Sequence, residues 1–185
     1  MIKKFLTVIF VLLILCSCNE KPNDNPNFSI FTYRSDMSKY KGLNSINHNF
    51  VGTTVSELGK VINEKQSGAF VLSRESCNHC QMVMKLINEA AEELGVTVYY
   101  IDGESKTYPI VDTPDYDLLD SLIKSIEEPN DDGEITPQTP HFFTVVNGKF
   151  KDSIIGFSIK GNEPTESENS KQLDKYKKAL KVFVK

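Results

Sequence analysis

The sequence predicts an α/β fold built on a mixed sheet, and three patterns support this. A short apolar run at residues 69–72 is followed by a helical pattern over 82–94 and by a β-branched and aromatic run at 96–101. A strand–helix–strand order of this kind implies parallel pairing through a right-handed crossover. Farther along, Asn147-Gly148 joins two strand-like runs and predicts an antiparallel hairpin.

The other elements are expected from capping signals and periodicity. Thr54 and Glu57 match a capping box, and Thr113-Pro114 places a proline directly after an N-cap. Gly95 is a plausible stop for the helix that follows residue 77. The remaining expected elements are a candidate edge strand at 49–52, helices over 55–66, 114–126 and 170–183, and strands at 142–146 and 149–157.

The first residues predict a leader that is separate from the domain. Lys3-Lys4 precede an apolar stretch over 5–15, which is too short for a spanning helix of about 20 residues. Leu15-Cys16-Ser17-Cys18 resembles the lipobox of bacterial lipoproteins. The resemblance implies cleavage after residue 17 and a lipid on Cys18. An uncleaved anchor and an ordinary secretory signal are the alternatives.

The chain therefore divides into three expected parts. A signal peptide covers residues 1–17, a lipid-anchored tether rich in Asn, Ser, Lys and Pro covers 18–49, and a folded domain covers 50–185. The expected location is a bacterial cell envelope, with the domain anchored to the membrane on its extracytoplasmic side. The net charge of −4 becomes −6 when the leader and its two lysines are removed. Nucleic acid is consequently not expected as a partner.

Cys77-Asn78-His79-Cys80 lies where the strand at 69–72 gives way to the following helix. Free N–H groups and the positive end of the helix dipole stabilise a thiolate there, and such cysteines have pKa values of about 3.5–7.5. The three-residue offset puts both thiols on one side of the first turn, close enough to form a Cys77–Cys80 disulfide. So short a loop constrains an unfolded chain little. A redox role for the two cysteines is therefore favoured over a disulfide that only stabilises the fold.

The CxxC at a helix start, Thr139-Pro140 before a strand, the hairpin and the C-terminal helix together resemble the thioredoxin superfamily. The resemblance covers about residues 54–185 and implies a three-layer α/β/α fold with a central mixed sheet. The chain is most similar to bacterial thioredoxin-like proteins that include bacteriocin-transport accessory proteins. In these, a similar CxxC follows a short strand and an arginine, here Arg74.

The resemblance also implies roles for individual residues. Cys77 is the expected attacking thiolate and Cys80 the resolving thiol. Pro140 is the expected cis-proline facing them, with the Thr139 backbone pairing to substrate. The alternatives are that Pro140 only begins a strand in trans, or that Pro137 takes its place.

Two departures separate the sequence from thioredoxin itself. There is no tryptophan, and Ser76 occupies the position before the first cysteine. Val71 stands where thioredoxins carry a buried acid that assists proton transfer to the resolving cysteine. The proton acceptor for Cys80 is consequently not identified by the sequence.

Asn78 and His79 are expected to tune the redox direction. A histidine beside the second cysteine resembles the disulfide-forming and isomerising branches of the superfamily. A partly protonated imidazole at His79 would stabilise the Cys77 thiolate and make the disulfide a better oxidant. The alternative is an exposed loop histidine with little influence. His141 is expected either within reach of the same site or simply at the start of a strand.

The predicted function is a membrane-anchored, extracytoplasmic thiol–disulfide oxidoreductase that acts on protein or peptide thiols. It needs no dissociable cofactor, a membrane redox partner is a candidate, and the oxidant or isomerase direction is favoured. The alternatives are a reducing thioredoxin-like protein and an export-linked peptide-binding accessory protein. A third alternative is a Cu(I) or Zn(II) module that uses Cys77, Cys80 and either His79 or His141.

Overall fold

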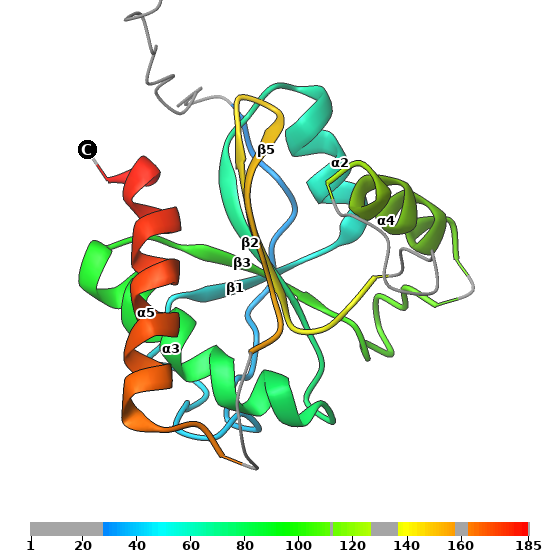
Figure 1. Cartoon of the computed structure of the whole chain (residues 1–185). Coiled ribbons are helices and arrows are strands. Elements are labelled where there is room, and N and C mark those ends of the chain that lie inside the picture. The colour runs from blue at the N-terminus through cyan, green and yellow to red at the C-terminus, as the bar shows by residue number, and fades with distance from the viewer. Residues whose placement is uncertain (1–27, 112, 127–136, 158–162, 185) are drawn as a thin grey trace, which may run out of the picture.

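The computed structural model describes residues 28–111, 113–126, 137–157 and 163–184 (Figure 1). The predicted signal peptide, Cys18 and the first part of the predicted tether lie outside the described residues. Within the described part of the chain, no helix is long and apolar enough to cross a membrane.

The centre of the domain is a five-stranded sheet in the order β1-β3-β2-β4-β5. Strand β2 pairs in parallel with β3 and antiparallel with β4, so the predicted mixed sheet is confirmed. Every residue of β2 is buried, because helices cover both faces of the sheet and a strand at its centre meets no solvent. The strands are β1 (Phe50–Thr53), β2 (Gly68–Ser73), β3 (Val98–Asp102), β4 (His141–Val146) and β5 (Lys149–Ile155).

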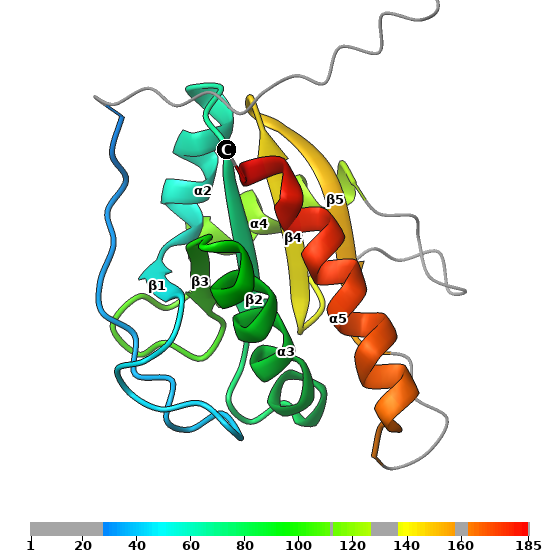
Figure 2. The same ribbon diagram turned by 90° about the vertical axis from the view of Figure 1, so that its left-hand side faces the viewer.

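In the described part of the chain, helices α2 to α5 form the two outer layers (Figures 1 and 2). Helices α2 (Val55–Asn63) and α4 (Pro114–Lys124) pack together on one face, with Leu58 and Leu119 buried beneath them. Helices α3 (Asn78–Leu94) and α5 (Glu166–Leu180) cover the other face, and a short 3₁₀ turn, η1 (Lys181–Phe183), follows α5. This three-layer arrangement with this strand order is the thioredoxin fold, and the predicted fold class is confirmed.

The predicted hairpin and helix stop are also present. Asn147 and Gly148 both have positive φ, at 52° and 76°, as a tight two-residue turn between β4 and β5 requires. Gly95 ends α3 in the left-handed conformation at φ 64°.

The N-terminus of α2 forms only half of its predicted capping box. The Thr54 side chain accepts a hydrogen bond from the Glu57 N–H at 3.3 Å, as expected. The Glu57 carboxylate instead accepts from the backbone N–H of Phe31 at 3.0 Å. Glu57 therefore ties the N-terminal segment to α2.

The last helix begins earlier than predicted. Its N-cap is Thr165, and Thr165 and Glu168 form a complete capping box. The sequence predicted a helix only over 170–183, because the residues just before it carry no apolar stripe. Charged residues in a first helical turn give no periodic signal, so capping chemistry sets this boundary.

Residues 28–49 pack against the domain, although the predicted tether was expected to reach residue 49. Tyr33 and Gly52 exchange two backbone hydrogen bonds, at 2.9 and 2.8 Å, beside β1. Met37 is fully buried and Tyr40 is 3% exposed. Figure 2 shows this segment, in blue, running past the β1 side of the sheet. Isolated apolar residues in a polar stretch have no periodicity, which is why the sequence pattern did not reveal this packing.

Candidate functional site

The two cysteines occupy the first turn of α3, directly after the loop that leaves β2. Cys77 is the N-cap residue, and its sulfur accepts a hydrogen bond from the Cys80 N–H at 3.4 Å. Both cysteines are free thiols in this structure. Cys77 is half-buried, whereas Cys80 is completely buried in the core beneath α3. Of the two sulfurs, that of Cys77 is therefore the one that another molecule can reach.

The Thr139–Pro140 peptide bond is cis, as the sequence predicted, and it lies beside Cys77. The Cys77 thiol donates a hydrogen bond to the Thr139 carbonyl oxygen at 3.5 Å. The Arg74 Nε donates to the Thr139 hydroxyl at 3.0 Å, so the loop before the CxxC is fastened to the same residue. The fold thus brings together residues about sixty positions apart.

The environment of Cys77 favours its thiolate. Burial alone would raise the pKa of Cys77, but hydrogen bonds outweigh this effect and lower the pKa below its ordinary value. These bonds come from Cys80, from Thr139 and from the backbone N–H of His79. The backbone N–H groups at the start of α3 thus stabilise the Cys77 thiolate, as expected for a cysteine at the N-terminus of a helix.

The environment of Cys80 has the opposite effect. Burial, and to a smaller extent the contact with Cys77, raise the pKa of Cys80 to about 11, although a hydrogen bond from Ser73 acts in the opposite direction. At neutral pH Cys77 is therefore the stronger nucleophile of the pair. Cys80 is held as a thiol next to it.

Asn78 and His79 are exposed on the first turn of α3. The backbone N–H of His79 contributes to the stabilisation of the Cys77 thiolate. The redox-tuning role of the Asn78 and His79 side chains stays a prediction.

Glu104 is a residue of this region that the sequence analysis missed. The Ser76 N–H donates to its carboxylate at 3.2 Å, and the Ser76 hydroxyl binds the same carboxylate. These bonds lower the pKa of Glu104. Strands β2 and β3 are parallel, so the loops that follow them emerge at the same edge of the sheet. That geometry could have indicated the pairing before the structure was known.

His141 is the first residue of β4 and is fully buried, which agrees with the expectation of a strand residue. Its Nε2 lies 2.8 Å from the Ser153 hydroxyl, and its ring packs edge-on against Phe143. Among the residues that the structure describes, no group of three or more His, Cys, Asp or Glu side chains could hold a metal ion.

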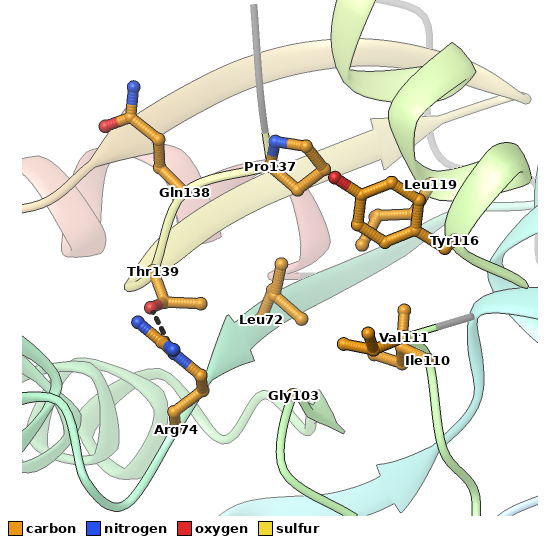
Figure 3. A pocket seen from close by; sticks show the side chains of 10 residues that line it. All are labelled: Leu72, Arg74, Gly103, Ile110, Val111, Tyr116, Leu119, Pro137, Gln138 and Thr139. Atoms are coloured by element: carbon orange, nitrogen blue, oxygen red, sulfur yellow. Dashed lines mark hydrogen bonds between the residues drawn. The ribbon is translucent and has the colours of Figure 1, made fainter. Parts of the chain in front are cut away.

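A pocket of about 390 Å³ borders Thr139 (Figure 3). Arg74 and Thr139 form one wall, and Tyr116 and Leu119 of α4 form the opposite wall. The pocket depends on residues from distant segments, so no local sequence pattern could have revealed it. The lining residues are Leu72, Arg74, Gly103, Ile110, Val111, Tyr116, Leu119, Pro137, Gln138 and Thr139.

Sequence comparison matches the chain to no protein-family model and to no curated protein. Structural comparison finds thioredoxins at low identity. Thioredoxin O2 from Arabidopsis thaliana, in its oxidised state, is 14% identical, with a TM-score of 0.45 over 76% of this chain and 98% of the other. Thioredoxin from Trypanosoma brucei brucei is 13% identical, with a TM-score of 0.43 over 74% and 96%. The fold assignment rests on the strand order and layers described above.

Burial of His141 predicts a loss of stability in mild acid. Desolvation lowers the pKa of His141 to about 4 from an ordinary value of 6.5. Between these pH values the unfolded chain binds a proton that the folded domain excludes, so stability present above about pH 6.5 is lost as the pH falls toward 4. We expect His141 to account for about 2 kcal/mol of destabilisation at pH 5 relative to pH 7.

Urea unfolding of the wild type and of His141→Gln, each at pH 7 and pH 5, measures this contribution. The variant should show a smaller difference between the two pH values than the wild type. An equal difference in both proteins would show that His141 is not responsible.

Proposed function

We propose that this protein is a thiol–disulfide oxidoreductase that acts on protein or peptide thiols. The observation that carries the proposal is the placement of Cys77. Its sulfur sits at a helix N-terminus, is partly accessible, has a lowered pKa and lies 3.5 Å from the carbonyl oxygen that precedes cis-Pro140. Cys80 is buried one turn farther along α3, where it can resolve a mixed disulfide.

The thiol–disulfide exchange proceeds in two steps. The Cys77 thiolate attacks a client disulfide, which forms a Cys77–client bond, breaks the client S–S bond and releases a client thiolate that takes up a proton. Cys80 then loses its proton and attacks the Cys77 sulfur. The Cys77–Cys80 disulfide forms, and the second client thiol leaves. Oxidation of a client dithiol is the reverse of this sequence.

The client segment binds along Thr139. The Thr139 backbone, just ahead of β4, offers strand-like pairing, and the neighbouring pocket offers apolar surface from Leu72, Ile110 and Leu119. The exposed Arg74 at its wall favours a client that carries an acidic or polar group there. We propose an extended peptide segment that places an apolar side chain in this pocket (Figure 3).

The favoured direction is oxidation or isomerisation. Every group that stabilises the Cys77 thiolate stabilises the reduced protein and so makes the disulfide more oxidising. The backbone donors described above act in this way, and we propose that the His79 side chain adds to them. The reducing direction is the alternative.

The proposed location is outside the cytoplasm of a bacterium, with Cys18 carrying a lipid and the domain facing away from the membrane. The lipobox-like Leu15-Cys16-Ser17-Cys18 supports this proposal. A membrane redox protein that reoxidises or reduces the Cys77–Cys80 pair is the expected partner. The resemblance to bacteriocin-transport accessory proteins supports, as a second candidate, an export-linked role in which the Thr139 face binds peptides and the cysteines take no part.

Single cysteine variants distinguish these two functions. Cys77→Ser should reduce turnover of a disulfide-containing peptide to background, because the attacking thiolate is gone. Cys80→Ser should retain the first step and accumulate a mixed disulfide with the peptide, detectable by non-reducing electrophoresis and mass spectrometry. Turnover by Cys77→Ser at the wild-type rate would rule out the proposed chemistry and favour the binding role.

Equilibration with glutathione measures the redox direction. We expect a Cys77–Cys80 potential less negative than about −270 mV, the value typical of thioredoxin. His79→Ala should shift it to more negative values, whereas Asn78→Ala, one residue away, serves as the matched control and should shift it less. A potential at or below that of thioredoxin would support the reducing alternative.

Fractionation of bacterial cells tests the anchor. The wild-type protein should be found with membranes and be released by detergent but not by salt. Cys18→Ala should abolish lipid attachment. Membrane association that persists unchanged in Cys18→Ala would instead indicate an uncleaved anchor.

A further inference from the structure

A chain of three buried hydroxyl groups lies behind Cys80. Tyr40 is 3% exposed, Ser73 is 0% exposed and Tyr100 is 7% exposed. The Tyr40 hydroxyl donates to the Ser73 hydroxyl at 3.0 Å, and the Tyr40 and Tyr100 oxygens lie 3.1 Å apart. Tyr40, Tyr100 and Cys80 belong to the same buried cluster, and hydrogen bonding by Ser73 lowers the pKa of the Cys80 thiol. The three hydroxyls therefore lie together beside the resolving cysteine.

The direction of these bonds follows from the number of protons available. Each hydroxyl carries one proton. Because Tyr40 donates its proton to Ser73, it can only accept from Tyr100. The Ser73 proton is then available to Cys80, which agrees with the lowering effect of Ser73 on the pKa of that thiol. Donation in this order would stabilise a negative charge that forms on the sulfur.

This arrangement depends on the N-terminal segment, which supplies Tyr40. The segment is held beside the CxxC by an ion pair between Lys39 and Glu75 at 2.8 Å. A hydrogen bond from the Lys41 N–H to the Gln81 side chain, at 2.9 Å, holds it to α3. Buried hydroxyls cost free energy unless they are hydrogen-bonded, and Tyr40 meets this requirement for both Ser73 and Tyr100.

We propose that Tyr100, Tyr40 and Ser73 form a hydrogen-bond relay that stabilises the Cys80 thiolate while Cys80 attacks the mixed disulfide on Cys77. This proposal rests on the proposed function and assigns these residues as positioning residues of the second step. Cys80 loses its proton, the Cys77–Cys80 bond forms as the Cys77–client bond breaks, and the departing client thiolate takes up one proton in exchange. The relay donates hydrogen bonds and accepts no proton. It therefore takes over the stabilising part of the role for which Val71 has no polar group.

The titratable groups around the relay keep the tyrosine hydroxyls in the form that donates hydrogen bonds. Burial raises the pKa of both Tyr40 and Tyr100, so their hydroxyls stay protonated at neutral pH. The charge of Asp102 in β3 also raises the pKa of both tyrosines. The other titratable groups that interact with Cys80 are Cys77 on its own helix and Tyr176 of α5, whose hydroxyl accepts from Gln172.

The two steps can be separated with dithiobis-nitrobenzoate, an aromatic disulfide that releases a coloured thiol at each step. Attack by Cys77 releases the first thiol, and attack by Cys80 on the mixed disulfide releases the second. Stopped-flow absorbance over a range of pH gives both rates for the full chain. The variants Ser73→Ala, Tyr40→Phe and Tyr100→Phe each remove one hydroxyl. Tyr99→Phe is the matched control, because Tyr99 packs against the opposite core with Phe70.

We expect Tyr40→Phe and Ser73→Ala to slow the second release about tenfold at pH 7 and to raise the midpoint of its pH profile by about one unit. The first release should keep its rate, which also shows that each variant is folded around Cys77. Tyr100→Phe should have a smaller effect in the same direction, and Tyr99→Phe none. A second release with unchanged rate and pH midpoint in Tyr40→Phe and Ser73→Ala would overturn the relay alone. Absence of the first release in the wild type would overturn the proposed thiol exchange, and the relay with it.

Discussion

The antiparallel pairing of β2 with β4 at the centre of the sheet is the constraint on which the site depends. Leu72, near the end of β2, pairs with His141, at the start of β4. The chain that leaves β2 and the chain that enters β4 must therefore meet at the same edge. Cys77 follows the first and Thr139-Pro140 precedes the second, so the register of this pair sets the Cys77–Thr139 contact. A slip of one residue in this register would turn every side chain of a strand to the other face of the sheet and would displace the Cys77–Thr139 contact.

The two cysteines differ because the helix start spans the boundary between solvent and core. Cys77 is at the N-cap, where backbone N–H groups are free to bind its sulfur. Cys80 is one turn deeper, where burial disfavours its ionised form. The same three-residue spacing that brings the sulfurs together thus gives them opposite electrostatic surroundings. The proposed division between an attacking and a resolving thiol would follow from the difference in depth along a single helical turn.

Sequence patterns predicted most of the fold and the central part of the site because those features are local. Helical periodicity, the Gly95 stop, the Asn147-Gly148 turn and the helix-start CxxC all act through neighbouring residues. The contributions of Tyr40 and Glu104 were missed because each depends on a tertiary contact with a distant loop or strand. The pocket beside Thr139 was missed for the same reason.

The packing of residues 28–49 also changes the length of chain available to any anchor at Cys18. A chain spans at most about 3.5 Å per residue. A linker from residue 18 to residue 50 could therefore reach about 110 Å, whereas a linker from residue 18 to residue 28 could reach about 35 Å. The shorter linker is comparable in length to the thickness of the bilayer hydrocarbon core. The domain would then sample only the layer next to the membrane surface. Substrates still emerging from that membrane would meet it at a higher local concentration than those free in solution.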